Sequence, residues 1–412
     1  MIFPRRIVIS IYQSSRILQS KLNHVRNSSD LRSVATKYQD IINSKRNSHS
    51  KNLRKELDWR NVIAHAEQIV GYPTSYLNLR WLFNDEIANT AIHLRKLVSS
   101  GHPLLKHSRN LLLGSNSNLQ SVGLIILLVS KAAGAVAEIV EMKRTGHMIH
   151  STMCNLQLAD KNSDKYKDLL YGNKIALLTG DYLFATCFFK LGGLRNNDVT
   201  KLIASGLRDL VEGDYFGCHD GQPLPAKPKG ADSKPYIWEN ENNLGKLGSN
   251  DILGQCKDEW VLRTILTSGS ILGKGCQAAM KLSNQETTKE KKVYLLGVHM
   301  SLLWQLYLDI KDFYVHPLSF SLVGAPVMFA LWEYPTIYGL FVEAKLENRP
   351  IQHKELYYAV KSTRAMEYLS LFLNSELEAI LRFSDSFPVE DARVALQKMA
   401  STVHWETLQY IE

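Results

Sequence analysis

The sequence has few cysteines, no long uninterrupted apolar run and, outside its first 55 residues, no excess of charge of either sign. Its five cysteines are scattered without a Cys-x-x-Cys pair, so neither a disulfide framework nor a zinc site is predicted. The longest apolar stretch, 122–140, contains Lys131 and Glu138 and many small residues, which favours a buried helix over a membrane span. We therefore expect no transmembrane segment and no secretory signal.

The positive charge of the chain lies at its N-terminus. Of the 49 Lys and Arg residues, 12 fall within residues 1–55, where only Asp30 and Asp40 are acidic. Serines and short apolar clusters lie between these basic residues, as in a mitochondrial transit peptide. We predict a leader at 1–55 and a location in the mitochondrial matrix, with a disordered basic tail or a nucleic-acid arm as the alternative. The nearly neutral remainder argues against a nucleic-acid partner.

The remainder, 56–412, is predicted to be one all-α domain. The chain is 45% hydrophobic and 22% charged, which is enough to bury a large core. Apolar residues recur at helical spacing, and no convincing strand pattern occurs. The expected helices are 58–70, 76–99, 103–113, 119–145, 165–170, 173–192, 196–213, 258–283, 288–312, 326–347, 353–382 and 388–409.

A long loop insertion is predicted at 217–258, where repeated Gly and Pro interrupt a polar stretch. The loop is either a surface insertion or a lid or subunit-contact element. Tyr236, Ile237 and Trp238 favour contact, because exposed aromatic side chains are costly unless something buries them.

Two carboxylates stand out on the helix expected at 288–312. Asp309 and Asp312 are three residues apart, so they point the same way on a helix and could share a cation. The same spacing also occurs by chance in many helices with solvated carboxylates.

Several segments along the chain keep the order and spacing of one known enzyme family. They are Glu141-Met142 with Thr145 and Met148-Ile149-His150, Gly172-Asn173-Lys174-Ile175-Ala176-Leu177-Leu178-Thr179-Gly180-Asp181, Trp260-Val261-Leu262-Arg263-Thr264, Gln305-Leu306-Tyr307-Leu308-Asp309-Ile310-Lys311-Asp312-Phe313 and Leu322-Val323-Gly324-Ala325-Pro326. In this order they resemble the trans-prenyl (polyprenyl) diphosphate synthases, and the resemblance spans about 60–400. It implies an isoprenoid synthase type helical bundle.

The resemblance also implies two aspartate-rich clusters, which hold magnesium ions against the departing diphosphate. In the first cluster, neutral residues replace the carboxylates: Ser151, Thr152, Asn155. In the second, Leu308 replaces the first aspartate, so Asp309 and Asp312 remain as a remnant metal site. Neutral hydroxyl and amide oxygens are poor magnesium ligands, so we expect both clusters to be degraded and no cofactor to be assigned to this chain.

The positions that would contact substrate are weakened as well. His102 and Pro103 stand where the family's Gly-Lys-Arg clamps a diphosphate, so two fixed cations are lost. The resemblance leaves a vestigial substrate-binding set: His102, Lys174, Arg263, Thr264 and Gln305. Arg263 would keep the charge of a diphosphate-contacting lysine, or it forms an ordinary ion pair. His147 and His150 could be a metal pair, but a packed or hydrogen-bonded pair is favoured.

The resemblance is strongest to non-catalytic subunits of heteromeric long-chain synthases. It implies a regulatory or stabilising subunit, inactive alone, that joins a homologous catalytic chain, expected as a heterotetramer, with magnesium on that partner. The complex would make the ubiquinone side chain from allylic and isopentenyl diphosphate. Peripheral association with the inner membrane is compatible with this role. The stretch 124–136 is expected to be core or subunit interface.

Two alternatives remain open from the sequence. The chain could itself be an active prenyltransferase with an altered metal site, using Asp309 and Asp312 with Asp181 or Asp214. It could instead be a helical mitochondrial scaffold unrelated to isoprenoids. The sequence does not determine product length, subunit ratio or the cleavage site of the leader.

Overall fold

The structure is a computed structural model, and it describes residues 58–71, 102–104, 122–130, 133–156, 163–219, 223–229, 252–385 and 389–411. Three predictions lie wholly or largely outside these residues: the leader at 1–55, the helix at 76–99 and the helix at 103–113. The aromatic cluster at 236–238 lies outside them too.

The described residues form helices with one two-stranded sheet, which confirms the predicted all-α class. The helices are α4 (Trp59–Val70), α8 (Val122–Val129), α9 (Gly134–His150), α10 (Asp164–Gly193), α11 (Asn197–Asp214), α12 (Cys256–Thr264), the π-helical turn η4 (Ile265–Gly269), α13 (Ser270–Leu282), α14 (Thr287–Val315), α15 (Ala325–Glu333), the 3-10 turn η5 (Pro335–Tyr338), α16 (Gly339–Leu346), α17 (His353–Lys361), α18 (Ala365–Ser384) and α19 (Glu390–Ile411).

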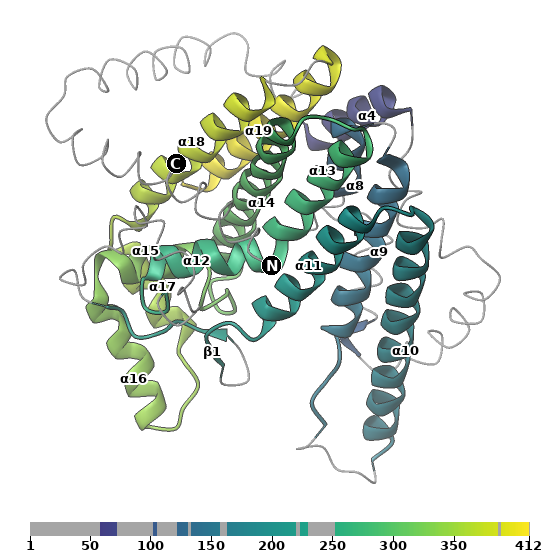
Figure 1. Ribbon diagram of the computed structural model, residues 1–412. Helices are drawn as coiled ribbons and strands as arrows, with labels where there is room; N and C mark the ends of the chain where they lie inside the picture. Colours follow the sequence, from purple (N-terminus) through teal and green to yellow (C-terminus); the bar gives the residue numbers. More distant parts are fainter. Residues whose placement is uncertain are drawn as a thin grey trace, which may run out of the picture.

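Helix α14 runs through the middle of the bundle (Figure 1) and packs against α13, α18, α19 and α15. Its closest crossing is with α13, where a Cβ on Gly297 would lie 2.8 Å from the Cα of Gly273. The two backbones therefore meet without intervening side chains. Helix α10 lies at the edge of the bundle and packs mainly against α9.

Polar caps begin several of these helices where the sequence offers them. The side chain of Asp58 accepts a hydrogen bond from the backbone N–H of Arg60 at the start of α4. Ser163 caps α10 and Asn196 caps α11 in the same way. Such caps satisfy backbone donors that the first turn leaves unpaired, and each stabilises the helix by about 0.5–2 kcal/mol.

Four predicted helix boundaries are wrong. The helix expected at 119–145 is two helices, α8 and α9, with Ser130 between them hydrogen-bonded to Ser283 at 2.9 Å. The two helices expected at 165–170 and 173–192 are one helix, α10, because its chain continues through Gly172.

The other two errors also have local causes. The helix expected at 326–347 breaks before Pro335, where Tyr334 leaves the helical conformation, as residues before proline usually do. The helix expected at 353–382 breaks at 362–364, where the hydroxyl of Thr363 accepts a hydrogen bond from the backbone N–H of Ala365.

The predicted insertion at 217–258 is irregular where the structure describes it, with one exception. Strands β1 (Cys218–His219) and β2 (Pro223–Leu224) pair antiparallel in a short hairpin directly after α11. Alternation over two residues is too short to be recognised in a sequence. Helix α12 begins at Cys256, two residues before the predicted end of the loop.

Two helices, α10 and α14, are long and apolar enough to span a membrane by length and composition alone. In α14 the most apolar window is 89% buried inside the bundle, as expected for a core helix. In α10 the corresponding value is only 28%, so much of its apolar surface faces outward. The sequence assigned the stretch 124–136 to core or interface. Its part within α8, 124–129, is fully buried, as are Ala133 and Val136.

Candidate functional site

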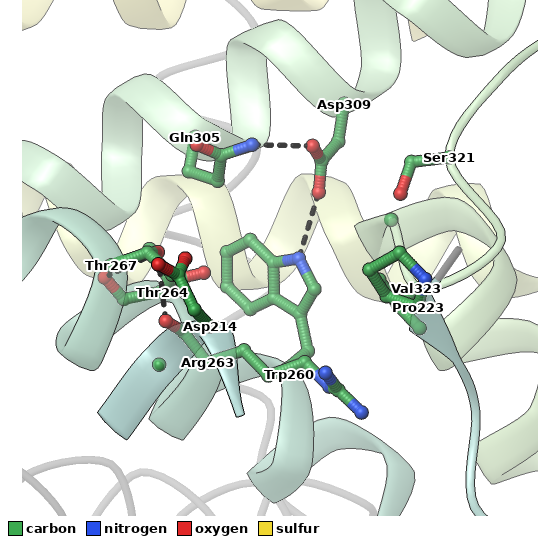
Figure 2. A pocket seen from close by; sticks show the side chains of 12 residues that line it. Asp214, Pro223, Trp260, Arg263, Thr264, Thr267, Gln305, Asp309, Ser321 and Val323 are labelled. Atoms are coloured by element: carbon green, nitrogen blue, oxygen red, sulfur yellow. Dashed lines mark hydrogen bonds between the residues drawn. The ribbon is translucent and has the colours of Figure 1, made fainter. Parts of the chain in front are cut away.

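A cavity of about 240 Å³ lies between α11, α12, η4, α14 and the turn before α15. Five of the candidate residues named from the sequence lie on its wall: Asp214, Arg263, Thr264, Gln305 and Asp309. The structure therefore brings together the motif at 305–313 of α14 and the motif at 260–264 of α12, which are about 40 residues apart in the chain. Trp260, Thr267 and Ser321 contribute further polar groups to the wall (Figure 2).

Asp309 projects into this site from α14, and protein donors occupy both of its carboxylate oxygens. Trp260 Nε1 and the backbone N–H of Ala325 each donate to Oδ2 at 2.8 Å. The side-chain amide of Gln305 donates to Oδ1 at 2.6 Å, as Figure 2 shows. Ala325 is the first residue of α15, and negative charge is favoured at a helix N-terminus. Asp309 therefore fastens α12, α14 and α15 to one another.

Burial also changes the acidity of this group. Desolvation raises the pKa of Asp309 to about 6, and the three hydrogen bonds oppose that rise. The nearby Asp312 adds to it by repulsion. Burial and the neighbouring Asp312 therefore favour the neutral, protonated form of Asp309 more than water would.

Asp312 points elsewhere and is half-exposed. His316, one turn further along α14, donates from Nδ1 to its Oδ1 at 3.1 Å. Asp312 does not line the cavity, and Leu308 packs against the hydrophobic core. Of the remnant pair predicted from the spacing, Asp309 therefore lines the cavity and Asp312 does not.

Arg263 is committed to structural contacts. Its guanidinium donates to Glu259 at 2.8 Å and to the backbone carbonyl of Phe216 at 2.7 Å. Its side chain also lies over the Phe216 ring at 5.0 Å. In Figure 2 the guanidinium lies on the far side of Trp260 from Asp309. Of the two sequence readings, the ion pair is the one that these contacts favour, although the pair is buried and not at the surface.

The degenerate first motif lies at the C-terminal end of α9. The hydroxyls of Ser151 and Thr152 donate to backbone carbonyls of their own helix, those of Met148 at 2.8 Å and Ile149 at 2.6 Å. Asn155 is exposed in the segment that follows. None of the three lines the cavity.

His102 and Lys174, the remaining predicted substrate residues, lie away from the cavity as well. The ring of His102 is buried against α10, where Nδ1 accepts from the backbone N–H of Leu104 at 3.1 Å. Its Nε2 then carries the proton and donates to Asn173 at 3.1 Å. Asn173 also bonds both backbone groups of Cys154 at 2.8 Å, which ties the first-motif segment to α10. Lys174 is exposed on α10.

The two histidines of α9 face carboxylates from different helices. His147 lies 3.5 Å from Asp214 of α11, and His150 lies 3.4 Å from Asp181 of α10. The prediction of packed, hydrogen-bonded histidines agrees with this arrangement. That these histidines face Asp181 and Asp214 could not be predicted from the sequence, because the two aspartates lie on other helices.

These residues do not fit the two-cluster magnesium site of the family. Magnesium requires several oxygen ligands with free lone pairs in octahedral geometry. The first-motif side chains are neutral and bonded to their own backbone, and Asp309 is engaged with three donors. Within the described residues, no group of three or more His, Cys, Asp or Glu side chains converges as a metal site would require.

Comparison with known proteins identifies the fold and the lineage. The all-trans-polyprenyl-diphosphate synthase PDSS2 of Mus musculus is 31% identical over 398 residues, covering 88% of this chain and 92% of that protein. The PDSS2 of Homo sapiens matches to the same extent. The chain belongs to the trans-polyprenyl diphosphate synthase family. This confirms the resemblance inferred from the motifs.

More distant members agree with this assignment. The mitochondrial hexaprenyl pyrophosphate synthase of Saccharomyces cerevisiae is 23% identical, over 65% of this chain and 62% of its own length. No family model matches the chain.

Solved structures of polyprenyl synthases share the fold of this chain. The polyprenyl synthetase of Streptomyces coelicolor superposes with a TM-score of 0.53 at 14% identity, covering 84% of this chain and 99% of its own. The decaprenyl diphosphate synthase of Rhodobacter capsulatus gives 0.51 at 15% identity, with 80% and 98% covered. These likenesses establish the predicted isoprenoid synthase type bundle.

Proposed function

We propose that this chain is a non-catalytic, stabilising subunit of a heteromeric trans-polyprenyl diphosphate synthase. The observation that carries the proposal is the occupancy of Asp309, whose two oxygens accept from Trp260, Gln305 and Ala325. A carboxylate that holds three helices together is not available to a magnesium ion without loss of those bonds. The neutral Ser151 and Thr152 on α9 point in the same direction.

The partner is a homologous chain with intact aspartate clusters, and that chain holds the magnesium. The complex condenses allylic and isopentenyl diphosphate into the ubiquinone side chain, in the mitochondrial matrix or at the inner membrane surface. The relatives support this assignment, since they are named as polyprenyl diphosphate synthases and, for the yeast protein, as a mitochondrial one. A pair of such heterodimers, a heterotetramer, is the expected assembly.

The outer face of α10 is the docking surface that fits this partner. Helix α10 has 30 residues and is about 45 Å long. Large apolar side chains are exposed along one side of it, at positions that share a helical face: Leu170, Leu177, Leu178, Tyr182, Phe188 and Phe189. An exposed apolar stripe of this length marks an interaction surface. Homologous chains can pair through equivalent helices about a two-fold axis, so a relative of the same fold is the natural occupant.

An elongation assay tests the proposal. This chain, the aspartate-intact partner and the co-expressed pair are each given magnesium, an allylic primer and radiolabelled isopentenyl diphosphate. We expect long product from the pair and none from this chain alone. Product from this chain alone would overturn the proposal and favour the active prenyltransferase with an altered metal site.

A further inference from the structure

A cluster of buried charges lies one helical turn below the cavity, and the metal and substrate motifs do not include it. Gly213 of α11 and Thr267 of η4 form part of the cavity wall. Asp209 precedes Gly213 by four residues, and Ser270 follows Thr267 by three, so both lie one turn deeper between the same helices. The hydroxyl of Ser270 donates to Asp209.

Two lysines complete the cluster from either side. The ammonium of Lys274, one turn beyond Ser270 on α13, donates to the same oxygen of Asp209. Lys143 enters from α9, one turn before His147, and donates to the backbone carbonyl of Ile203. Both lysine side chains are almost completely buried.

The packing at this level is specific for the lysine side chains. A Cβ on Gly206 of α11 would lie 3.3 Å from Lys143 Nζ and 3.4 Å from Lys274 Cδ. The missing side chain at position 206 therefore gives both lysines room between α9, α11 and α13. Burial lowers the pKa of Lys143 to about 7 and also lowers that of Lys274, which the charge of Asp209 partly restores.

The family reaction produces long apolar chains, as the names hexaprenyl and decaprenyl of the relatives state. In this chain, a prenyl tail that enters from the cavity towards the interior meets paired charges instead of an apolar channel. Separating Lys274 from Asp209 in an interior without water is strongly unfavourable. The cavity above the cluster, at about 240 Å³, is smaller than pockets that bury drug-sized ligands, which run from about 300 to 1,000 Å³.

We propose that Lys143, Asp209 and Lys274 form a polar plug that closes the interior of this subunit to prenyl chains. This chain then contributes no channel of its own to a growing prenyl product. The plug is a property of the isolated chain, so the inference does not depend on the proposed partnership.

Photolabelling of the full chain tests the plug. The probe is geranylgeraniol with a diazirine at the end of its tail, and labelled peptides are located by mass spectrometry. The wild-type chain should show no labelling in α11 or α13. The triple variant Lys143→Ala, Asp209→Ala, Lys274→Ala removes the charges and opens apolar space, and should be labelled there at least ten-fold more strongly.

A second triple variant, Lys143→Met, Asp209→Leu, Lys274→Met, fills a similar volume with apolar side chains and removes the charges. Replacing buried ion pairs by apolar residues of similar volume is often neutral or stabilising, so this variant should fold. We expect intermediate labelling, because flexible apolar side chains can be displaced by a prenyl tail. Wild-type labelling within α11 or α13 would overturn the plug. Folded variants that both remain unlabelled would overturn it as well; if the alanine variant fails to fold, the second variant decides by itself.

Discussion

At the scale of single residues, Asp309 is a carboxylate of the second aspartate-rich motif that makes structural hydrogen bonds to three donors. Its pairing with Gln305, four residues earlier on the same helix, could be anticipated from the sequence. Its bonds to Trp260 and Ala325 could not, because they depend on how α12 and α15 pack on α14. The motif therefore predicted the position of the carboxylate in the site but not the donors that occupy it.

Asparagine and alanine at position 309 should have different effects on stability. In Asp309→Asn the amide oxygen can still accept from Trp260 and Ala325, and the amide of Gln305 can flip to accept from the new N–H₂ group. We expect unfolding free energy within about 1 kcal/mol of wild type. In Asp309→Ala these donors lose their acceptor, which costs about 1–3 kcal/mol for each buried one. Urea unfolding monitored by circular dichroism measures both; equal losses in the two variants would contradict the hydrogen-bonding role.

Lys143 should make stability depend on pH. Its folded pKa of about 7 lies below the value of about 10.4 for an unfolded lysine, so between these values the unfolded chain binds a proton that the folded chain does not. Stability should therefore rise with pH from about 7 to 10, by up to about 1.4 kcal/mol per unit. Below pH 7 both states are protonated and the destabilisation is constant.

The variant Lys143→Met should remove this slope while leaving any contribution of the facing groups Lys274, Asp209 and Cys187 in place. Urea midpoints at pH 7, 8 and 9 provide the comparison. We expect the variant to be more stable than wild type at pH 7 and the difference to shrink as pH rises. Parallel pH dependence in the two proteins would contradict a perturbed Lys143.

At the scale of helices, the sequence predicted where most elements lie, because long amphipathic periods leave a clear pattern. The errors have two causes. In one, the apolar pattern continues across a point where the helix ends; in the other, a residue that often ends helices lies inside one. Ser130 interrupts an apolar stretch without changing its hydrophobic character, whereas Gly172 lies in a continuous helix because its face packs on His102. The exposure of the apolar face of α10 was not predicted either, since the sequence pattern of an apolar surface helix is the same as that of a core helix.

Charge placed on the outer face of α10 should weaken assembly. Phe189 is 83% exposed, and burying such a side chain against a partner is worth about 1.5–3 kcal/mol. The double variant Leu178→Glu, Phe189→Glu should therefore reduce affinity for the catalytic chain at least ten-fold, as measured by light scattering or titration of the purified chains.

The matched control is Leu346→Glu on α16, which is 80% exposed and lies on the opposite side of the bundle from α10 in Figure 1. It should assemble like wild type. Equal loss in the control, or no loss in the α10 variant, would mean that another surface binds the partner. If α10 inserts into lipid vesicles equally well with and without the partner chain, a membrane and not the partner covers its apolar face.

At the scale of the whole molecule, the chain keeps the fold of the synthase family, and under the proposed function its partner performs the chemistry. The helices keep the family arrangement, with α14 in the centre and the second-motif position facing a cavity. The fold could be predicted from motif order because packing tolerates change at individual polar positions. The consequence of those changes could be judged only once the contacts of Asp309 and Arg263 were known.

The most direct measurement is product formation by the co-expressed pair when this chain carries Asp309→Asn and Asp312→Asn together. If these carboxylates hold no catalytic magnesium, elongation should stay within about two-fold of wild type, since the charge changes are absorbed by local hydrogen bonds. The same substitutions in the aspartate cluster of the catalytic partner serve as the control and should abolish product. A loss of a hundred-fold or more from the variant of this chain, with assembly intact, would contradict the proposal and assign its remnant aspartates to the reaction.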